Sequence, residues 1–408
     1  MSYDVIIVGG GAAGLAAAVF LGRCADGRRI AVLEKGPRVG KKLMATGNGR
    51  CNLTNRHAAP AHYHGEDSAW CAYALAAFDV EATLDWFAGH GLVTTTEDSG
   101  RVYPYSNMAG SVLDVLRYAL ERPEIDLRAG CTVARIRRRG DGFTVESDQG
   151  SFSADKVILC AGGAAGSKVG GVMDGYQLGK QLGHHRTALY PSLVQLKTDP
   201  TYPRALKGVK AEARVRILRG GEVLAENKGE ILFTEYGVSG PAIFEISRAA
   251  ATGGEGLTVA LDFLPDWDEE GTTNWLRQRR DGAADREAGS LLAGTLHSRL
   301  GQMVCKAAGF TNQNAATLTD RELEKIGRCL RRFTLEVQGV CGFDQAQVTA
   351  GGLRTDEFDP ETMESRLVPG FYACGEVLDI DGDCGGYNLQ WAWSSGRLAG
   401  INAGKEIL

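Results

Sequence analysis

The chain has 408 residues, of which 44% are hydrophobic and 23% charged, a composition typical of a globular protein with two or three domains. Its formal net charge of −5 argues against a nucleic-acid partner, which favours a strongly basic surface. The ten cysteines form no Cys-x-x-Cys pair, no apolar run is long enough to span a membrane, and no secretory signal is present. We therefore expect a cytoplasmic protein with no membrane span and no metal site.

The first segment predicts a strand–turn–helix–strand unit. The strand, the helix and the second strand are predicted at residues 3–8, 15–21 and 30–33. Gly9, Gly11 and Gly14 lie between the first strand and the helix in the pattern Gly-x-Gly-x-x-Gly. The first glycine permits a tight turn, the second lets the backbone approach a pyrophosphate, and the third lets the helix pack closely on the strand. Ala12 and Ala13 would present their N–H groups to the phosphates at the start of this helix.

An acidic residue follows the second strand. Glu34 comes twenty residues after Gly14, where a carboxylate can accept hydrogen bonds from both ribose hydroxyls and repel a 2′-phosphate. The neighbouring Lys35 is included in the candidate site. A purely structural glycine turn would not explain Glu34, so this segment predicts dinucleotide binding.

Residues 36–56 are rich in Gly, Asn, Lys and Arg and predict a long polar loop, which inside a domain is usually functional. Glycines permit close backbone approach here, and the cations can offset the charge of a diphosphate. The alternative is a flexible surface loop with solvated lysines. The density of Asn and Gly favours turns shaped for a ligand. The candidate cofactor contacts in this loop are Lys42, Gly47, Asn48, Gly49, Arg50, Cys51 and Asn52.

The middle of the chain changes in character after residue 190. Before it, helices are predicted at residues 67–90, 107–122 and 174–182, and strands at 132–136, 142–147 and 151–159. The last of these strands runs into Ala161 and Gly162, a second candidate approach to the nucleotide. Residues 191–262 carry short alternating stretches that predict an antiparallel sheet or barrel, and residues 266–335 are charged and helical.

Glycines return from residue 347, and a helix is predicted at residues 388–401. Gly375 and Glu376 follow a short strand, where a carboxylate can hold a ribityl hydroxyl. Gly386 begins a turn that can face a flavin carbonyl or a phosphate through backbone N–H groups. Tyr387, Asn388 and Leu389 complete this turn. An acidic turn without a ligand is the alternative, but the combination with the first glycine loop indicates FAD.

The chain therefore predicts a discontinuous nucleotide-binding domain that carries an insertion. Its two parts are residues 1–190 and 341–408, and the β-rich insert covers residues 191–340 with a helical subdomain at about 266–335. Tyr103 and Tyr236 lie in glycine-flanked segments, where either could protonate a substrate carbon or hold a carbonyl. Aromatic packing is the alternative for both. Arg50 is a third candidate catalytic residue.

These segments together resemble the YhiN/BaiN-like (aminoacetone oxidase-like) flavoproteins, a bacterial group of NAD(P)/FAD-dependent oxidoreductases. The matching stretches are residues 4–18, 40–55, 100–106, 157–163, 174–183, 229–247, 349–353 and 371–400. The resemblance implies an α/β fold: a Rossmann-like FAD-binding domain of the glutathione-reductase type with an inserted β-rich domain and a small helical subdomain. It implies that Glu34 meets the adenine half of an extended FAD, with backbone contacts from Val133. Lys42, Gly47 and Glu376 would meet the pyrophosphate and ribityl.

The resemblance also implies an activity. Relatives of the BaiN type are similar to reductases of conjugated C=C bonds in 3-oxo bile acids or related steroids, with NADH or NADPH as the electron donor and a small-molecule substrate. Since only one nucleotide fingerprint is present, a nicotinamide donor would dock transiently or use the insert. The alternatives are an amine or hydroxy-acid oxidase, and a flavoprotein that acts on or senses nucleic acid. The sequence leaves the oligomeric state open.

Overall fold

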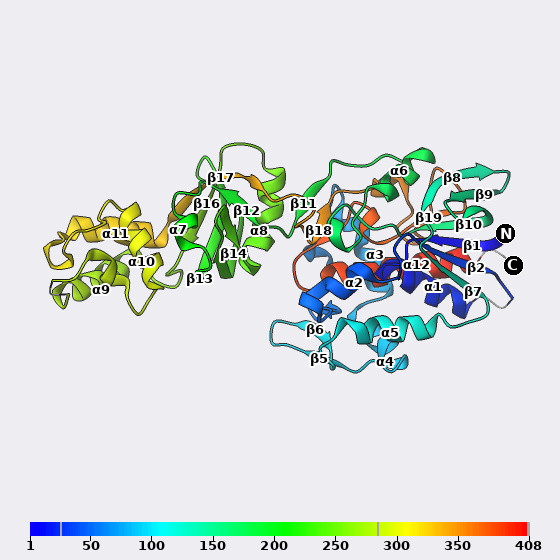
Figure 1. Cartoon of the computed structure of the whole chain (residues 1–408), viewed down its shortest axis with the longest axis horizontal. Coiled ribbons are helices and arrows are strands. Elements are labelled where there is room, and N and C mark those ends of the chain that lie inside the picture. The colour runs from blue at the N-terminus through cyan, green and yellow to red at the C-terminus, as the bar shows by residue number, and fades with distance from the viewer. Residues whose placement is uncertain (25–26, 284, 406–408) are drawn as a thin grey trace. The chain divides into compact units, whose positions relative to one another are not determined.

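The computed structural model describes residues 1–24, 27–283 and 285–405 (Figure 1). It divides into two units, which are described separately below. The first unit comprises Met1–Tyr190 and Gln347–Leu408, and the second comprises Pro191–Ala346. The short strand β11 (Tyr190–Ser192) spans the boundary in sequence.

A mixed sheet with a parallel core forms the centre of the first unit. Its strand order is β7 (Ile125–Ala129), β2 (Ile30–Glu34), β1 (Ser2–Val8), β10 (Gly150–Leu159), β9 (Gly142–Ser147) and β8 (Val133–Arg139), and β19 (Phe371–Ala373) also pairs with β10. β1 lies between β2 and β10 and is parallel to both. Its central residues Val5, Ile6 and Ile7 are fully buried, as expected for a strand covered on both faces. The predicted α/β Rossmann-like fold class is confirmed.

Two helices far apart in sequence pack against each other beside this sheet, α1 (Ala12–Arg23) and α12 (Tyr387–Lys405). Glycines every fourth residue allow the close approach. A Cβ atom on Gly396 would lie 2.5 Å from the carbonyl oxygen of Ala13, and one on Gly400 would lie 2.4 Å from that of Ala17. The backbones of the two helices are therefore in contact, and the middle of α12 is held beside the beginning of α1.

The prediction of a long polar loop at residues 36–56 is wrong in part, because this segment contains regular structure. It forms α2 (Lys41–Ala45), a 3-10 turn (Thr46–Gly49) and β3 (Thr54–Asn55). Leu43 and Leu53 are buried and anchor the segment to the core. The single helix predicted at residues 67–90 is also interrupted. Asp79 separates two helices and caps the second one, because its carboxylate accepts from the N–H of Ala82.

Short elements complete the first unit. They are the 3-10 turn Pro60–His62, β4 (Tyr63–His64), the 3-10 turn Ser68–Cys71, α3 (Ala72–Ala77), α4 (Val80–Gly89), β5 (Thr94–Thr96), β6 (Arg101–Pro104), α5 (Ala109–Ala119), the 3-10 turn Ser167–Val169, α6 (Asp174–Gln181), β18 (Val348–Ala350), the 3-10 turns Thr355–Glu357 and Gly375–Val377, and β20 (Asp381–Gly382). β4 and β20 form an antiparallel pair, and β6 pairs with both β3 and β5.

The second unit is a closed antiparallel barrel with helices. The barrel order is β12 (Leu196–Thr198), β15 (Gly237–Ser239), β14 (Glu222–Phe233), β13 (Lys210–Arg219), β16 (Leu257–Asp262) and β17 (Phe333–Val340). The helical elements are α7 (Pro203–Leu206), α8 (Pro241–Thr252), α9 (Glu269–Asp281), the 3-10 turn Ala288–Leu292, α10 (Ser298–Ala307), the 3-10 turn Ala315–Thr317 and α11 (Asp320–Arg331). The sequence predicts helices up to residue 335, but Phe333 already belongs to the barrel strand β17, so the helices end slightly earlier.

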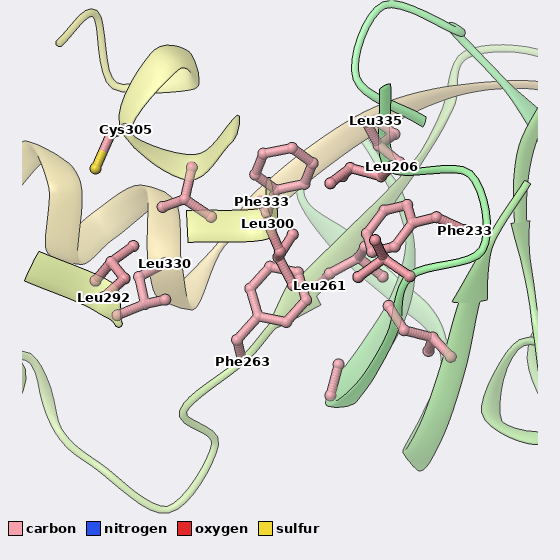
Figure 2. Packing of buried hydrophobic residues seen from close by; sticks show 14 of the residues in the cluster. Leu206, Phe233, Leu261, Phe263, Leu292, Leu300, Cys305, Leu330, Phe333 and Leu335 are labelled. Carbon is pink, nitrogen blue, oxygen red and sulfur yellow. The ribbon is translucent and has the colours of Figure 1, made fainter. Parts of the chain in front are cut away.

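One hydrophobic core joins the barrel to the helices of this unit (Figure 2). Phe263 and Phe333, whose ring centroids are 6.0 Å apart, lie between the barrel side chains and those of the helices. Leu261 of β16 and Leu300 of α10 are both fully buried in the same cluster. Because the two layers share their buried surface, we expect barrel and helices to unfold together.

Candidate functional site

The loop between β1 and α1 is closely packed at two of its three signature glycines. A Cβ atom on Gly9 would lie 2.4 Å from the carbonyl oxygen of Cys160, and one on Gly14 would lie 1.9 Å from that of Gly9. Gly11 differs, since a Cβ atom there would meet nothing within 4 Å. Gly11 is also the N-cap of α1 and makes no side-chain cap. The first N–H groups of a helix have no partner within the helix. The open space beside Gly11, at the start of α1, therefore fits a phosphate of FAD.

Glu34 lies directly against this loop. Its carboxylate accepts from the backbone N–H of Gly10 at 2.7 Å and from that of Gly36 at 2.5 Å. The N–H of Cys131 donates to the carbonyl oxygen of Glu34 at 2.8 Å, which brings the start of β8, and with it Val133, to the same edge. Lys35 instead pairs with Asp174, with 2.6 Å between Nζ and Oδ2.

Residues from three further segments surround the start of α1. The ammonium of Lys42 lies 2.5 Å from Oε2 of Glu376, and both side chains are partly buried. Oε1 of Glu376 accepts from the N–H of Thr349 at 3.0 Å. A Cβ atom on Gly375 would lie 2.7 Å from Cβ of Ala13, so the residues near 375 pack on α1.

The end of β10 contributes a further part of the same surface. Cys160 packs against Gly9, and Ala161 and Gly162 follow it directly. A Cβ atom on Gly162 would meet nothing within 4 Å, as at Gly11. Two predicted contact residues from separate strands therefore border open space.

The segment at residues 47–52 is held by backbone conformations rare outside glycine. Asn48 has φ of 56° and Cys51 has φ of 60°, beside two glycines with positive φ. Asn tolerates this region through local hydrogen bonding. Burial raises the pKa of the Cys51 thiol to about 12, which makes it a poor nucleophile.

A buried acceptor in this segment lacks a donor. Oδ1 of Asn52 is buried and has no hydrogen-bond partner among the residues that the structure describes. Since buried polar groups are nearly always satisfied, this atom fits an N–H donated by a ligand. A Cβ atom on Gly386 would lie only 2.9 Å from it, so the turn before α12 borders the same point. The residues present therefore fit FAD.

The turn before α12 is fixed by Asn388. Its side chain accepts from the N–H of Gly382 at 2.8 Å and donates to the carbonyl oxygen of that residue at 2.7 Å. Gly386 has φ of 104° and packs on the backbone of Thr54. The N-terminus of α12, with Tyr387 and Leu389, is thereby presented beside β3.

Two of the three candidate catalytic residues lie together. The guanidinium carbon of Arg50 is 3.9 Å from the ring centroid of Tyr103, and the same side chain bonds Glu97 at 2.9 Å. Burial, followed by the charge of Glu97, raises the pKa of the Tyr103 hydroxyl. Tyr236 belongs to the second unit, between β14 and β15. Burial and the neighbouring Cys341 raise the pKa of Tyr236.

A polar cluster beside the β4–β20 ribbon was not predicted from the sequence. Nδ1 of His62 lies 2.9 Å from Oδ2 of Asp383, and Nε2 of His64 lies 2.7 Å from Oδ1 of the same carboxylate. His62 ends the 3-10 turn before β4 and His64 lies in β4, and the only signal in the local sequence is their His-x-His spacing. Across the described residues 1–24, 27–283 and 285–405, no group of three His, Cys, Asp or Glu side chains is arranged to hold a metal ion.

Comparisons with known proteins cover the whole chain. The family model of the HI0933-like protein Rossmann domain matches residues 3–402. The 3-dehydro-bile acid delta(4,6)-reductase of Clostridium scindens is 38% identical over 404 residues, 98% of each chain. The ribosomal RNA dihydrouridine synthase of Escherichia coli is 30% identical over 395 residues, 96% of each chain. A solved quinol fumarate reductase of E. coli is 17% identical with a TM-score of 0.51, covers 99% of this chain and 70% of that chain, and shares the fold.

In the part of the chain that the structure describes, no helix is both long and apolar enough to cross a membrane.

Proposed function

Because the chain belongs to the HI0933-like Rossmann family of FAD-binding flavoproteins, as its sequence predicts, we propose that it is a reductase that saturates a carbon–carbon double bond conjugated to a carbonyl. One observation carries the proposal. The two relatives named above each match this chain over nearly their whole length. Both are named for the reduction of a carbon–carbon double bond, although their substrates differ. A delta(4,6) double bond of a 3-oxo steroid and the 5,6 double bond of uracil are both conjugated to a carbonyl.

The residues of the first unit suit this chemistry. Bound FAD would supply the hydride, and the protein would orient the substrate and polarise it. Tyr103 stays protonated at neutral pH because its pKa is raised, so its hydroxyl can donate a hydrogen bond to the substrate carbonyl. The Arg50 cation over its ring strengthens that donor and favours negative charge developing on the carbonyl oxygen. Glu34, Lys42 and Glu376 are assigned to binding the cofactor.

We assign a small 3-oxo steroid or bile acid with conjugated double bonds as the substrate, and NADH or NADPH as the electron donor. The higher identity to the bile-acid reductase supports the substrate class. The test uses purified holoprotein under anaerobic conditions. We expect NADH or NADPH to bleach the flavin absorbance, and a 3-oxo-4,6-diene bile acid to restore it with formation of the saturated product. Peroxide formation from amines would instead indicate an oxidase. If no unsaturated carbonyl compound reoxidises the reduced flavin, the proposal is refuted.

Variants test the catalytic role proposed for each tyrosine. Tyr103→Phe is expected to slow reoxidation by the enone about 10- to 100-fold while leaving FAD affinity unchanged, because only a bond to the carbonyl is lost. Tyr105→Phe is the matched control, since Tyr105 lies two residues along the same segment and is 74% exposed. Tyr236→Phe tests the other candidate acid in the same assay.

A second candidate function is the reduction of a uracil in ribosomal RNA. Besides the E. coli relative, a cavity on the outer face of the barrel favours it. The cavity has a volume of about 170 Å³ and is lined by Arg214, Arg216, Arg331 and Arg332, with Asp262 as the acidic residue. Nε of Arg331 is buried without a hydrogen-bond partner among the described residues. Such a cluster suits a phosphodiester.

The test of this second candidate uses unmodified ribosomal RNA transcribed in vitro, with dihydrouridine quantified by mass spectrometry of nucleosides. Formation of dihydrouridine would establish RNA as a substrate. In that case, Arg331→Gln should weaken RNA binding and reduce its dependence on salt, whereas Arg321→Gln on the exposed face of α11 should not. No dihydrouridine together with steroid reduction would support the first candidate.

A further inference from the structure

The sheet formed by β3, β6 and β5 carries Arg101 and Tyr103 on its central strand, β6. Arg101 pairs with Asn55 of β3, and Tyr103 pairs with Thr95 of β5. Because side chains alternate along a strand, residues two positions apart lie on one face, about 7 Å from each other along the strand. Tyr103 is buried and Arg101 is partly exposed. The ends of these two long side chains can therefore reach one small group of a ligand.

Both side chains border segments that we assign to the cofactor. A Cβ atom on Gly385 would lie 3.2 Å from Nε of Arg101, and the carbonyl oxygen of Gly385 accepts from Nδ2 of Asn55 at 2.9 Å. A Cβ atom on Gly47 would lie 3.3 Å from Cε1 of Tyr103. Arg101 therefore lies against the turn before α12, and Tyr103 lies against the loop that contains Gly47.

The guanidinium of Arg101 is unpaired across the described residues 1–24, 27–283 and 285–405, since it makes neither a hydrogen bond nor an ion pair with any of them. Arg50 differs, because its guanidinium bonds Glu97 at 2.9 Å and Asn107 at 2.5 Å. A guanidinium offers five N–H donors in a planar fork and always carries its charge. Arg101 therefore has its whole donor set available to a ligand, whereas Arg50 has part of its own in use.

The charge of Arg101 acts at the hydroxyl of Tyr103. Burial, followed by the charge of Glu97, raises the pKa of this hydroxyl, and the cations Arg101 and Arg50 oppose the rise, Arg101 the more strongly. Cys384 is the remaining titratable group that acts on it. The net rise in pKa keeps the hydroxyl protonated at neutral pH. A neutral donor and an unpaired cation thus lie side by side.

We propose that Arg101 and Tyr103 together bind the carbonyl oxygen of the substrate, with Arg101 as a further catalytic residue; the inference rests on the function proposed above. Addition of a hydride to the β-carbon moves the π electrons of the conjugated system onto that oxygen, which gives an enolate. The guanidinium and the hydroxyl donate to the enolate oxygen. A proton from water then forms the C–H bond at the α-carbon and the carbonyl is restored, so atoms and charge balance.

This assignment fits Arg101 better than the other anionic group of a bile acid. The side-chain carboxylate of a bile acid lies at the opposite end of the ring system from the 3-oxo group. Arg101 and Tyr103 are close neighbours on one strand. A substrate whose carbonyl meets Tyr103 therefore cannot place its carboxylate on Arg101. A cation beside the carbonyl oxygen matches charge that develops only during the reaction, which is the kind of contact that accelerates it.

The first test follows reoxidation of the holoprotein, reduced anaerobically with dithionite and mixed with a 3-oxo-4,6-diene bile acid by stopped flow. Arg101→Gln is expected to slow this step about 100- to 1000-fold, the loss typical of one donor to a developing oxyanion. Arg101→Lys should recover part of the rate because it keeps the charge. Arg139→Gln, on the exposed face of β8, is the control and should react at the wild-type rate. Thermal unfolding of Arg101→Gln should match the wild type, since no bond to a described residue is lost.

A second measurement does not depend on turnover. A steroid with an aromatic A ring carries a phenol oxygen in place of the 3-oxo group, and its ultraviolet difference spectrum reports whether that phenol is ionised. Bound to the oxidised holoprotein, the phenol should ionise at lower pH than in solution, because a neighbouring cation favours the phenolate. In Arg101→Gln the midpoint should return toward the value in solution, by about one pH unit or more.

The outcomes separate this inference from the proposed function. A wild-type rate in Arg101→Gln, or an unchanged midpoint of phenol ionisation, would overturn the role of Arg101. So would a loss of rate confined to the bile acid and absent for the same dienone without its carboxylate, since Arg101 would then bind the carboxylate. If no enone reoxidises the wild type, the proposed function fails, and the phenol measurement alone decides whether the oxyanion site exists. If the phenol does not bind either, both fail.

Discussion

Gly11→Ala separates the cofactor role of the glycine loop from its structural role. A methyl group at this position would meet nothing within 4 Å, and the backbone φ of −81° is allowed for alanine. The effect on the stability of the apoprotein is therefore confined to the helix N-cap preference and to the entropy of the unfolded chain. Each of these contributes about 1 kcal/mol or less, with opposite signs.

Binding of FAD should respond differently, because the methyl group would occupy the space that we assign to the pyrophosphate. Loss of one charge-assisted hydrogen bond costs about 1.5–3 kcal/mol. This corresponds to an increase of about 10- to 150-fold in the Kd for FAD. Gly14→Ala is the matched comparison. Its methyl group would lie 1.9 Å from the carbonyl oxygen of Gly9, so we expect a loss of folding stability of about 1–3 kcal/mol or more.

The assay is titration of each apoprotein with FAD by flavin fluorescence, together with thermal unfolding of the apoproteins. The expected pattern is a stable Gly11→Ala variant with weak FAD binding, and a destabilised Gly14→Ala variant. Wild-type affinity in a well-folded Gly11→Ala protein would show that no phosphate lies at this loop. An unfolded Gly11→Ala apoprotein would show that the space is not open.

Three further predictions follow from charge and burial. Glu376→Gln removes a side chain that we assign to binding the cofactor and leaves the Lys42 cation without its partner. We expect it to raise the Kd for FAD about tenfold, measured by the same titration. The lowered pKa of Asp383 stabilises the fold at pH values above the usual carboxyl pKa, and this contribution is lost as the pH falls through the lowered value; thermal unfolding of Asp383→Asn between pH 3 and 7 should lack that dependence. The Cys51 thiol should resist iodoacetamide at pH 8 while the exposed Cys24 reacts, as read by mass spectrometry; equal labelling would contradict the burial.

Much of the first unit could be predicted because its signals are local. The glycine loop, the strand before it and Glu34 lie within about 35 residues, and each position has its own steric or electrostatic requirement. The predicted barrel also follows from local alternation in residues 191–262. The α/β fold class is confirmed, as are the family and the enzyme class that the resemblance implied.

What could not be predicted depends on contacts between distant segments. His62 and Asp383 are 321 residues apart and flank β4 and β20, strands of only two residues each that have no periodicity to detect. The order in residues 41–55 comes from burial of Leu43 and Leu53 under the rest of the unit, which the polar composition concealed. Tyr236 lies in the turn between the barrel strands β14 and β15, and its catalytic role remains a prediction.

The glycine-mediated contact between α1 and α12 has a consequence during synthesis. A nascent chain that has left the ribosome only as far as the barrel already contains the phosphate loop, yet the helix that packs against α1 has not been made. Gly396 and Gly400 reach Ala13 and Ala17 only after almost all of the chain has been translated. Uptake of the cofactor would therefore report that translation is nearly complete, and a product truncated before α12 would remain colourless.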